Sequence, residues 1–157
     1  MNFIIPFITA TFAFGTAIFY CLYCVEKSVL KLVFNKGKIV VTEDNIRFTH
    51  KALKRLSPLL PPANGFVILF GISALIYQCN LQSWNFESLS IPLFYIGITL
   101  YIIFIGKIAT AVKNLMTIKS DQELSLVTAN VRHLITQHHI ALFANLGVVI
   151  LEFALFT

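Results

Sequence analysis

Charged side chains are scarce in this sequence. Asp, Glu, Lys and Arg make up 12% of its 157 residues, about half the share in soluble domains. Hydrophobic residues make up 57% of the chain, which is more apolar surface than a soluble protein of 17.7 kDa could cover. The chain also lacks a Ser-His-Asp set, a phosphate-binding glycine loop and an Asp/Glu metal cluster. These absences argue against the common hydrolases and nucleotide-binding proteins.

The apolar residues are gathered into four blocks, at about residues 3–24, 63–81, 91–106 and 139–156. About 20 apolar residues in a helix cross a bilayer core of about 30 Å. The sequence therefore predicts an all-α fold, a polytopic membrane protein in which four transmembrane helices form a bundle. Residues 1–157 would form a single integral membrane domain. The first block follows no basic stretch and is too long for a signal peptide, so we expect it to remain as a helix.

The basic residues predict the orientation of the chain. All twelve Lys and Arg lie in the segments 25–62 and 107–138. The positive-inside rule places both segments in the cytoplasm, with the N- and C-termini outside the inner (plasma) membrane. No nucleic-acid recognition motif accompanies the net charge of +5, so we expect membrane lipid as a partner and no nucleic acid.

Both cytoplasmic segments are expected to contain helices. Residues 43–56 form a basic amphipathic pattern, which predicts a helix lying on the inner membrane surface or packed on the bundle. Its candidate lipid-headgroup residues are Arg47, Lys51, Lys54 and Arg55. Helical periodicity also continues beyond the third block, and residues 121–156 could form one long helix. Ser120 and Glu123 have the spacing of a capping box for that helix.

Three polar residues of the last block are the main candidates for a site. His138, Asn145 and Glu152 are spaced seven apart, so they share one helix face. The same face continues the apolar stripe of residues 124–135, and we expect it to point into the bundle. A buried carboxyl needs hydrogen-bond partners. Hydroxyl groups of the other blocks at similar depth supply the candidates Thr9, Tyr77 and Tyr95.

Metal, cofactor and redox sites have weaker support. His133 and His138 are five residues apart, which is a poor fit to the i, i+4 spacing of helical metal ligands. We therefore expect no metal and no cofactor. Cys21 and Cys24 form a C-x-x-C pair. Without a thioredoxin-like pattern around them, they are expected to be buried, inert thiols.

Three stretches resemble the family of small four-span membrane proteins that includes the anthrone-oxygenase-like proteins. They are FAFGTAIFYCLYCVEKSVLKL, FTHKALKRLSPLLPPANGFVILF and NVRHLITQHHIALFANLG. The first resembles the family's first helix, which ends in an acidic residue before a short basic stretch. Glu26 would be that acid. The resemblance implies a four-span fold and a cofactor-free oxygenase activity.

Three functions remain open on this sequence. The first is a binding or accessory protein for an apolar, lipid-like ligand or for a membrane partner. The second is a cofactor-free membrane oxidoreductase of the anthrone-oxygenase type, with Glu152, Asn145 and His138 lining the pocket. The third is a proton-coupled carrier that assembles as a homo-oligomer, because four helices enclose little pathway alone.

Overall fold

The computed structural model describes residues 3–34, 41–85 and 90–156. Parts of the basic segment 25–62 and of the link between the second and third blocks lie outside these ranges. The described residues form helices and no strand, which confirms the predicted all-α class. The long helices are α1 (Ile4–Glu26), α4 (Leu60–Leu81), α5 (Ser90–Ile102) and α7 (Leu124–Phe156).

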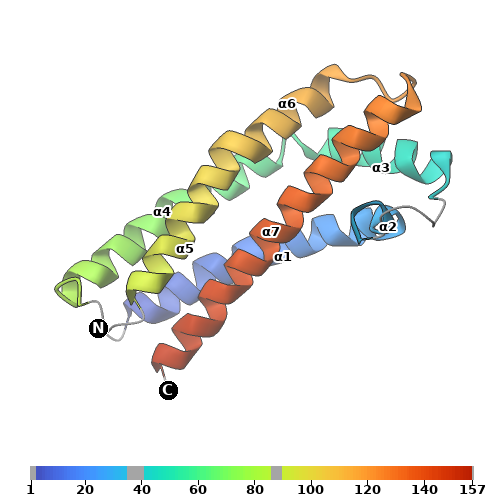
Figure 1. Ribbon diagram of the computed structural model, residues 1–157. Helices are drawn as coiled ribbons and strands as arrows, with labels where there is room; N and C mark the ends of the chain where they lie inside the picture. The colour runs from blue at the N-terminus through green and yellow to red at the C-terminus, as the bar shows by residue number, and fades with distance from the viewer. Residues whose placement is uncertain (1–2, 35–40, 86–89, 157) are drawn as a thin grey trace.

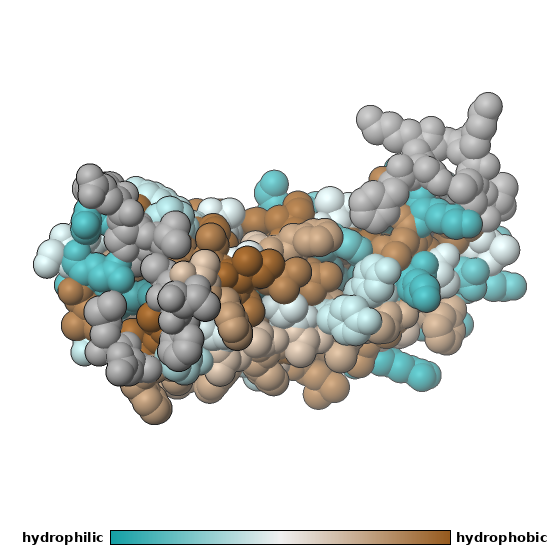
Figure 2. Space-filling model, turned by 90° about the horizontal axis from the view of Figure 1, so that it is seen from below, coloured by the Kyte–Doolittle hydropathy of each residue, from teal (hydrophilic) through white to brown (hydrophobic). Residues whose placement is uncertain are grey.

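Within the described residues, four helices are long and apolar enough to cross a membrane. They run side by side in an elongated bundle (Figure 1), in which α1 packs mainly on α7, and α4 packs between α1 and α5. The first described residues of α1 and the end of α7 lie at one end of the bundle, called here the terminal end. Figure 2 shows apolar residues gathered over the middle of one face and polar residues toward both ends. The chain is a multi-pass membrane protein, as predicted.

The helix of the third span continues past residue 106, as the periodicity beyond the third block predicted. After α5, a π-helical stretch (Ile103–Ile108) leads directly into α6 (Ala109–Thr117). A π-helical stretch inserts an extra residue into the helical turn and is often found beside functional sites. The helix of the second span, α4, begins at Leu60. Its prolines occupy the first turn, where their missing N–H groups have no helical partner to lose.

Helix α3 (Glu43–Leu56) lies across the other end of the bundle, called here the α3 end (Figure 1). Thr42 caps its first turn, with Oγ1 accepting from the backbone N of Asn45 at 3.4 Å. Glu43 and Asp44 lie in the first turn and Lys54 and Arg55 in the last, which suits the helix dipole. Two short helices follow α1 in the sequence: a 3-10 helix (Lys27–Val29) and α2 (Lys31–Phe34).

The interior consists of two apolar clusters. The larger fills the bundle between the four spans. The smaller joins α3 to the membrane-distal part of α7, and its buried members are Val29, Ile46, Val127, Val131 and Ile135. The predicted apolar stripe of α7 is therefore buried. Its burial shows that α3 is packed on the bundle, which was one of the two alternatives for this helix.

Two local expectations were wrong. Cys21 and Cys24 are exposed on the outer surface of α1, since they face away from α7 and α4, whereas Cys79 is buried. The capping box of Ser120 and Glu123 is not formed, because α7 begins only at Leu124. Ser120 instead bonds to a side chain of α3, and Glu123 Oε1 accepts from Ser125 Oγ at 2.6 Å.

Candidate functional site

The polar stripe of α7 faces the interior of the bundle. His138, Asn145 and Glu152 are 4%, 3% and 0% exposed. Large apolar side chains on the opposite side of the same helix point outward, among them Phe143 and Phe153. The seven-residue spacing thus predicted the buried face correctly. The structure distributes the three residues along the bundle, however, and gives each a different partner.

Glu152 lies near the terminal end and pairs with a residue that the sequence analysis did not select. Gln78 Nε2 of α4 donates to Glu152 Oε2 at 3.1 Å, and both side chains are buried. Tyr77 was expected as a partner but is 56% exposed. It precedes Gln78 in α4, and successive residues of a helix point about 100° apart. Because Gln78 faces inward, Tyr77 faces outward.

The predictions that Thr9 and Tyr95 bond to Glu152 were also wrong. Tyr95 is 62% exposed, so its hydroxyl does not reach the interior of the bundle. Thr9 is half-buried and lines an outward-facing apolar groove with Phe153, away from the buried face of α7. The interior position opposite Glu152 is filled by the amide of Gln78. An apolar stretch of α4 containing a single glutamine was the available sequence signal.

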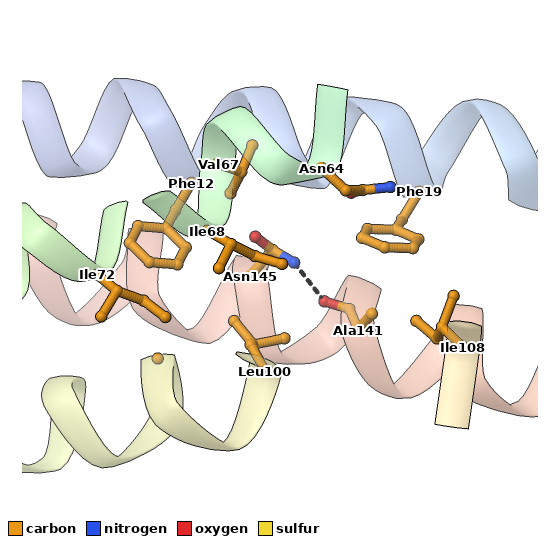
Figure 3. A pocket seen from close by; sticks show the side chains of 11 residues that line it. Phe12, Phe19, Asn64, Val67, Ile68, Ile72, Leu100, Ile108, Ala141 and Asn145 are labelled. Atoms are coloured by element: carbon orange, nitrogen blue, oxygen red, sulfur yellow. Dashed lines mark hydrogen bonds between the residues drawn. The ribbon is translucent and has the colours of Figure 1, made fainter. Parts of the chain in front are cut away.

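Asn145 lies in the middle of the bundle. Its Nδ2 donates to the carbonyl of Ala141 at 2.7 Å, one turn back along α7 (Figure 3). Its Oδ1 points at α1, where Gly15 makes room for it. A Cβ atom at position 15 would lie 2.4 Å from Asn145 Oδ1. Gly15 therefore permits the close approach of α1 and α7 at this asparagine.

His138 is hydrogen-bonded to an acid at the end of the first span. Its Nδ1 donates to Glu26 Oε1 at 2.6 Å, and the side chains are 4% and 0% exposed. The ring of Phe19 lies against the imidazole, with a centroid distance of 5.9 Å. A carboxylate on Nδ1 fixes the orientation of the imidazole and leaves Nε2 as the nitrogen that can meet a ligand. The sequence analysis noted both residues but did not pair them.

His138 also forms part of the wall of a partly open cavity at the α3 end. The cavity has a volume of about 300 Å³ and lies between α1, α4, α6 and α7. Its apolar walls include Phe19, Leu22, Leu60 and Val112. This volume is at the lower end of the range for small-molecule sites, about 300–1,000 Å³. Glu152 and Asn145 do not line this cavity.

A second, narrow cavity continues from the first toward the middle of the bundle. Phe19, Asn64 and Ile108 line both, and Asn145 lines the narrow one (Figure 3). It holds only about 20 Å³, room for about one water molecule. An organic ligand would therefore occupy the larger cavity.

Asn64 was also missed by the sequence analysis. It lies in the first turns of α4 and is 5% exposed. Its side chain lines both cavities. It lies two residues after Pro62, next to a stretch that the sequence analysis expected to break the chain.

The four predicted headgroup residues of α3 divide into two pairs. Arg47 donates to the carbonyls of Ser120 and Gln122, and Lys54 donates to the carbonyl of Ile118 at 3.1 Å. Arg47 and Lys54 therefore bind the turn between α6 and α7, and their contact with lipid stays a prediction. The turn leaves carbonyl groups without helical partners, and basic side chains supply the donors. Lys51 and Arg55 are exposed.

His50 of α3 strengthens the same junction. Its ring is buried, and Nδ1 is hydrogen-bonded to Ser120 Oγ at 2.9 Å. Burial lowers the pKa of His50 below its usual 6.5, and the nearby charge of Lys54 lowers the pKa further. His50 is therefore a structural histidine that joins α3 to the α6–α7 turn.

No group of three or more His, Cys, Asp or Glu side chains within the described residues is arranged to hold a metal ion. Comparison with known proteins adds no relative, since no family model, curated protein or solved structure matches the chain. The functional argument therefore rests on the cavity and on the residues around it.

Proposed function

We propose that this protein binds an apolar, lipid-like small molecule inside the bundle, with His138 contacting the polar group of the ligand. The observation that carries the proposal is the cavity of about 300 Å³, whose walls are apolar except for a few polar side chains. Such a combination is typical of small-molecule sites, in which apolar walls supply affinity and a few polar groups fix orientation. The Glu26–His138 pair then acts as a preoriented hydrogen-bonding group.

The proposal includes the location of the protein. We place it in the inner (plasma) membrane with both termini outside, because the basic residues are concentrated in the segments that contain α3 and the α6–α7 turn. The cavity would then lie near the cytoplasmic surface of the bilayer. Reporter fusions after Thr157 and within α3 test this orientation. A cytoplasmic report from the fusion after Thr157 would overturn it.

Lipid headgroups are proposed as partners of Lys51 and Arg55, the two basic residues of α3 that are exposed. Phe48 on the same helix is 66% exposed. A basic surface with an aromatic side chain suits the boundary of an anionic membrane. Changing Lys51 and Arg55 to Gln should weaken binding to anionic vesicles by about 1 kcal/mol per charge. The matched change of Arg47 and Lys54 should instead loosen the α6–α7 turn.

Ligand binding can be tested by filling the cavity. Val112 lines it, so Val112→Phe should displace the ligand, whereas Ile150→Phe places the same ring on an exposed, outward-facing position. The purified wild-type protein in a mild detergent should carry a small apolar molecule in native mass spectrometry. Val112→Phe should lose it and Ile150→Phe should retain it. Equal retention by both variants would show that the molecule binds elsewhere.

A second candidate function is a cofactor-free oxidoreductase of the anthrone-oxygenase type. The observation that favours it is the carboxylate–imidazole pair beside an apolar cavity, since an imidazole held by a carboxylate can accept a proton from a bound substrate. Under this proposal His138 Nε2 is the proton acceptor and Glu26 positions it. His138→Gln should then abolish turnover while the ligand still binds. If His138 is only a binding residue, His138→Gln should lower affinity and no turnover should be detected in the wild type.

A further inference from the structure

An open groove of about 680 Å³ lies at the α3 end of the bundle, where the apolar part of α1 ends. Its walls come from the last turn of α1, the 3-10 helix that follows, α2 and α3. The 3-10 helix packs on α3, and Figure 1 shows the end of α1, α2 and α3 at the same end of the bundle. The groove shares no lining residue with the cavity beside His138, so it is a separate feature of the surface.

Two lysines line this groove without a protein partner. Lys27 and Lys31 are exposed, and among the described residues neither ammonium group has a hydrogen bond or an ion pair. Ser28 adds an exposed hydroxyl between them. Glu26 precedes Lys27, but it is buried and bonded to His138. No acidic side chain of the described residues lines the groove, so the lysines give it a positive charge.

The α3 wall of the groove is apolar. Phe48 is 66% exposed, and Ala52 follows it one turn later. Asp44, one turn before Phe48, is exposed but does not line the groove. Val25 and Cys24, at the end of α1, extend the apolar surface toward the membrane span. The groove therefore combines a cationic side with an apolar side.

The position of the groove along the chain matches the headgroup level of a bilayer. Residues 3–25 contain no charged side chain, and Lys27 is the first basic residue of the sequence. Lysines at the end of a span keep their stems along apolar surface and extend their amines to the interface. A phospholipid offers both complementary parts, because its phosphate is an anion and its acyl chains are apolar.

We infer that this groove binds one anionic phospholipid, whose phosphate contacts Lys27 and Lys31 and whose acyl chain lies against Phe48 and the outer surface of α1. The inference rests on the proposed placement of the α3 end at the cytoplasmic surface, where anionic headgroups are concentrated, and it does not depend on a ligand in the cavity. A zwitterionic lipid carries its own cation beside the phosphate, so the lysines would gain less from it. The site is distinct from Lys51 and Arg55, which do not line the groove.

Native mass spectrometry in a mild detergent tests this site with two lipids of the same chains, dioleoylphosphatidylglycerol and dioleoylphosphatidylcholine. We expect the first phosphatidylglycerol molecule to bind at least about tenfold more tightly than the first phosphatidylcholine molecule. Lys27→Gln with Lys31→Gln should remove this preference. Lys27→Arg with Lys31→Arg should retain it, because the charge is kept. Lys51→Gln with Arg55→Gln is the matched control, which removes two charges outside the groove and should leave the first phosphatidylglycerol molecule preferred.

The two exposed cysteines of α1 can locate the bound lipid. Cys24 lines the groove and Cys21 does not, whereas Cys79 is buried. In Cys21→Ser, phosphatidylglycerol should slow the alkylation of Cys24 by N-ethylmaleimide more than phosphatidylcholine does. In Cys24→Ser, the two lipids should affect the alkylation of Cys21 equally. Equal effects on Cys24 would contradict a lipid in the groove.

The remaining outcomes separate this inference from the proposed function. Equal binding of the two lipids by the wild type would overturn the inference, as would a preference that is lost in Lys51→Gln with Arg55→Gln and survives in Lys27→Gln with Lys31→Gln. Val112→Phe fills the cavity beside His138 and leaves the groove intact, so it should keep the preference. Loss of the preference in Val112→Phe would place the lipid in the cavity, which overturns the inference and leaves the proposed function standing. The reporter fusions test the orientation separately.

Discussion

Glu26 Oε1 and His138 Nδ1 lie 2.6 Å apart, although 112 positions separate the two residues in the sequence. Glu26 is the last residue of α1, and His138 lies inside α7, the helix on which α1 packs most extensively. The bond joins these two helices at the point where the cavity begins. The bond therefore stabilises the contact between α1 and α7. It also fixes the orientation of the imidazole at the cavity wall.

The strength of this pair can be measured with a double-mutant cycle. Glu26→Leu and His138→Leu each leave one buried polar side chain without its partner, so each should lower the free energy of unfolding. The double variant should lose less free energy of unfolding than the two single variants lose together. The difference is the coupling energy, which we expect to be about 1–2 kcal/mol. Unfolding in mixed micelles gives these values. Asp44→Asn with Lys51→Gln, both exposed on α3, is the additive control. Additive losses at Glu26 and His138 would mean that the bond does not form.

The contact of Gly15 with Asn145 gives a second prediction. Gly15→Ala places a methyl group 2.4 Å from Asn145 Oδ1, so it should destabilise the bundle by about 1–3 kcal/mol. Gly147→Ala is the control, since a Cβ atom at Gly147 meets nothing within 4 Å. It should be neutral or slightly stabilising, because alanine is the better helix former. Thermal unfolding in detergent distinguishes the two variants.

A second background variant tests whether Asn145 causes the penalty of Gly15→Ala. Asn145→Ala removes the oxygen that the new methyl group would meet. Gly15→Ala should therefore be less harmful in the Asn145→Ala background than in the wild type. A penalty that is the same in both backgrounds would show that the α1–α7 approach does not depend on Asn145.

Glu152 is expected to act through Gln78. Glu152→Gln keeps an oxygen that can accept from Gln78 Nε2, so the fold should be retained. Glu152→Leu leaves the buried amide unpaired and should destabilise by about 1–2 kcal/mol. Adding Gln78→Leu should restore part of that loss, since replacing both partners by apolar groups removes the unpaired donor. Thermal unfolding of the three variants tests this order. A double variant less stable than Glu152→Leu alone would exclude the structural role.

The pH dependence of α3 docking follows from His50. Its pKa is lowered in the folded protein, by burial and by Lys54, so the unfolded state binds a proton more readily than the folded state. The stability that His50 contributes is complete above pH 6.5 and falls as the pH drops below that value. Measured relative to its intrinsic rate at each pH, hydrogen exchange of the α3 amides should accelerate as the pH falls from about 6.5 to 5.

His50→Gln is the matching variant, because glutamine can still bond to Ser120 but does not titrate in this range. Arg47, Lys54 and the Glu43–Arg47 ion pair lie beside His50 on α3. The acceleration should therefore vanish in His50→Gln. Acceleration that persists in the variant would assign the effect to another group.

The sequence predicted those features that depend on length and periodicity. The long apolar blocks predicted four spans. The spacing of His138, Asn145 and Glu152 predicted which face of α7 is buried. Both follow from helix geometry alone. The amphipathic pattern of residues 43–56 likewise predicted α3, whose bounds in the structure are Glu43–Leu56.

The partners across helices could not be predicted in this way. Which side chain of α4 meets Glu152 depends on the rotation of α4, and Tyr77 and Gln78 are neighbours that point in different directions. The Glu26–His138 pair depends on the relative height of α1 and α7. The sequence analysis did not select Asn64, because the prolines before it are compatible with both a loop and the first turn of a helix. Each of these features requires tertiary packing.

The central claim is that a ligand occupies the cavity beside His138. Photolabelling with a decanoate analogue that carries a diazirine on its chain, followed by peptide mapping, tests this claim most directly. The account predicts labels on cavity residues such as Leu22, Leu60 and Val112, competed by decanoate and lost in Val112→Phe. Labels confined to the outward-facing residues Phe143 and Phe153, and not reduced by competition, would contradict it.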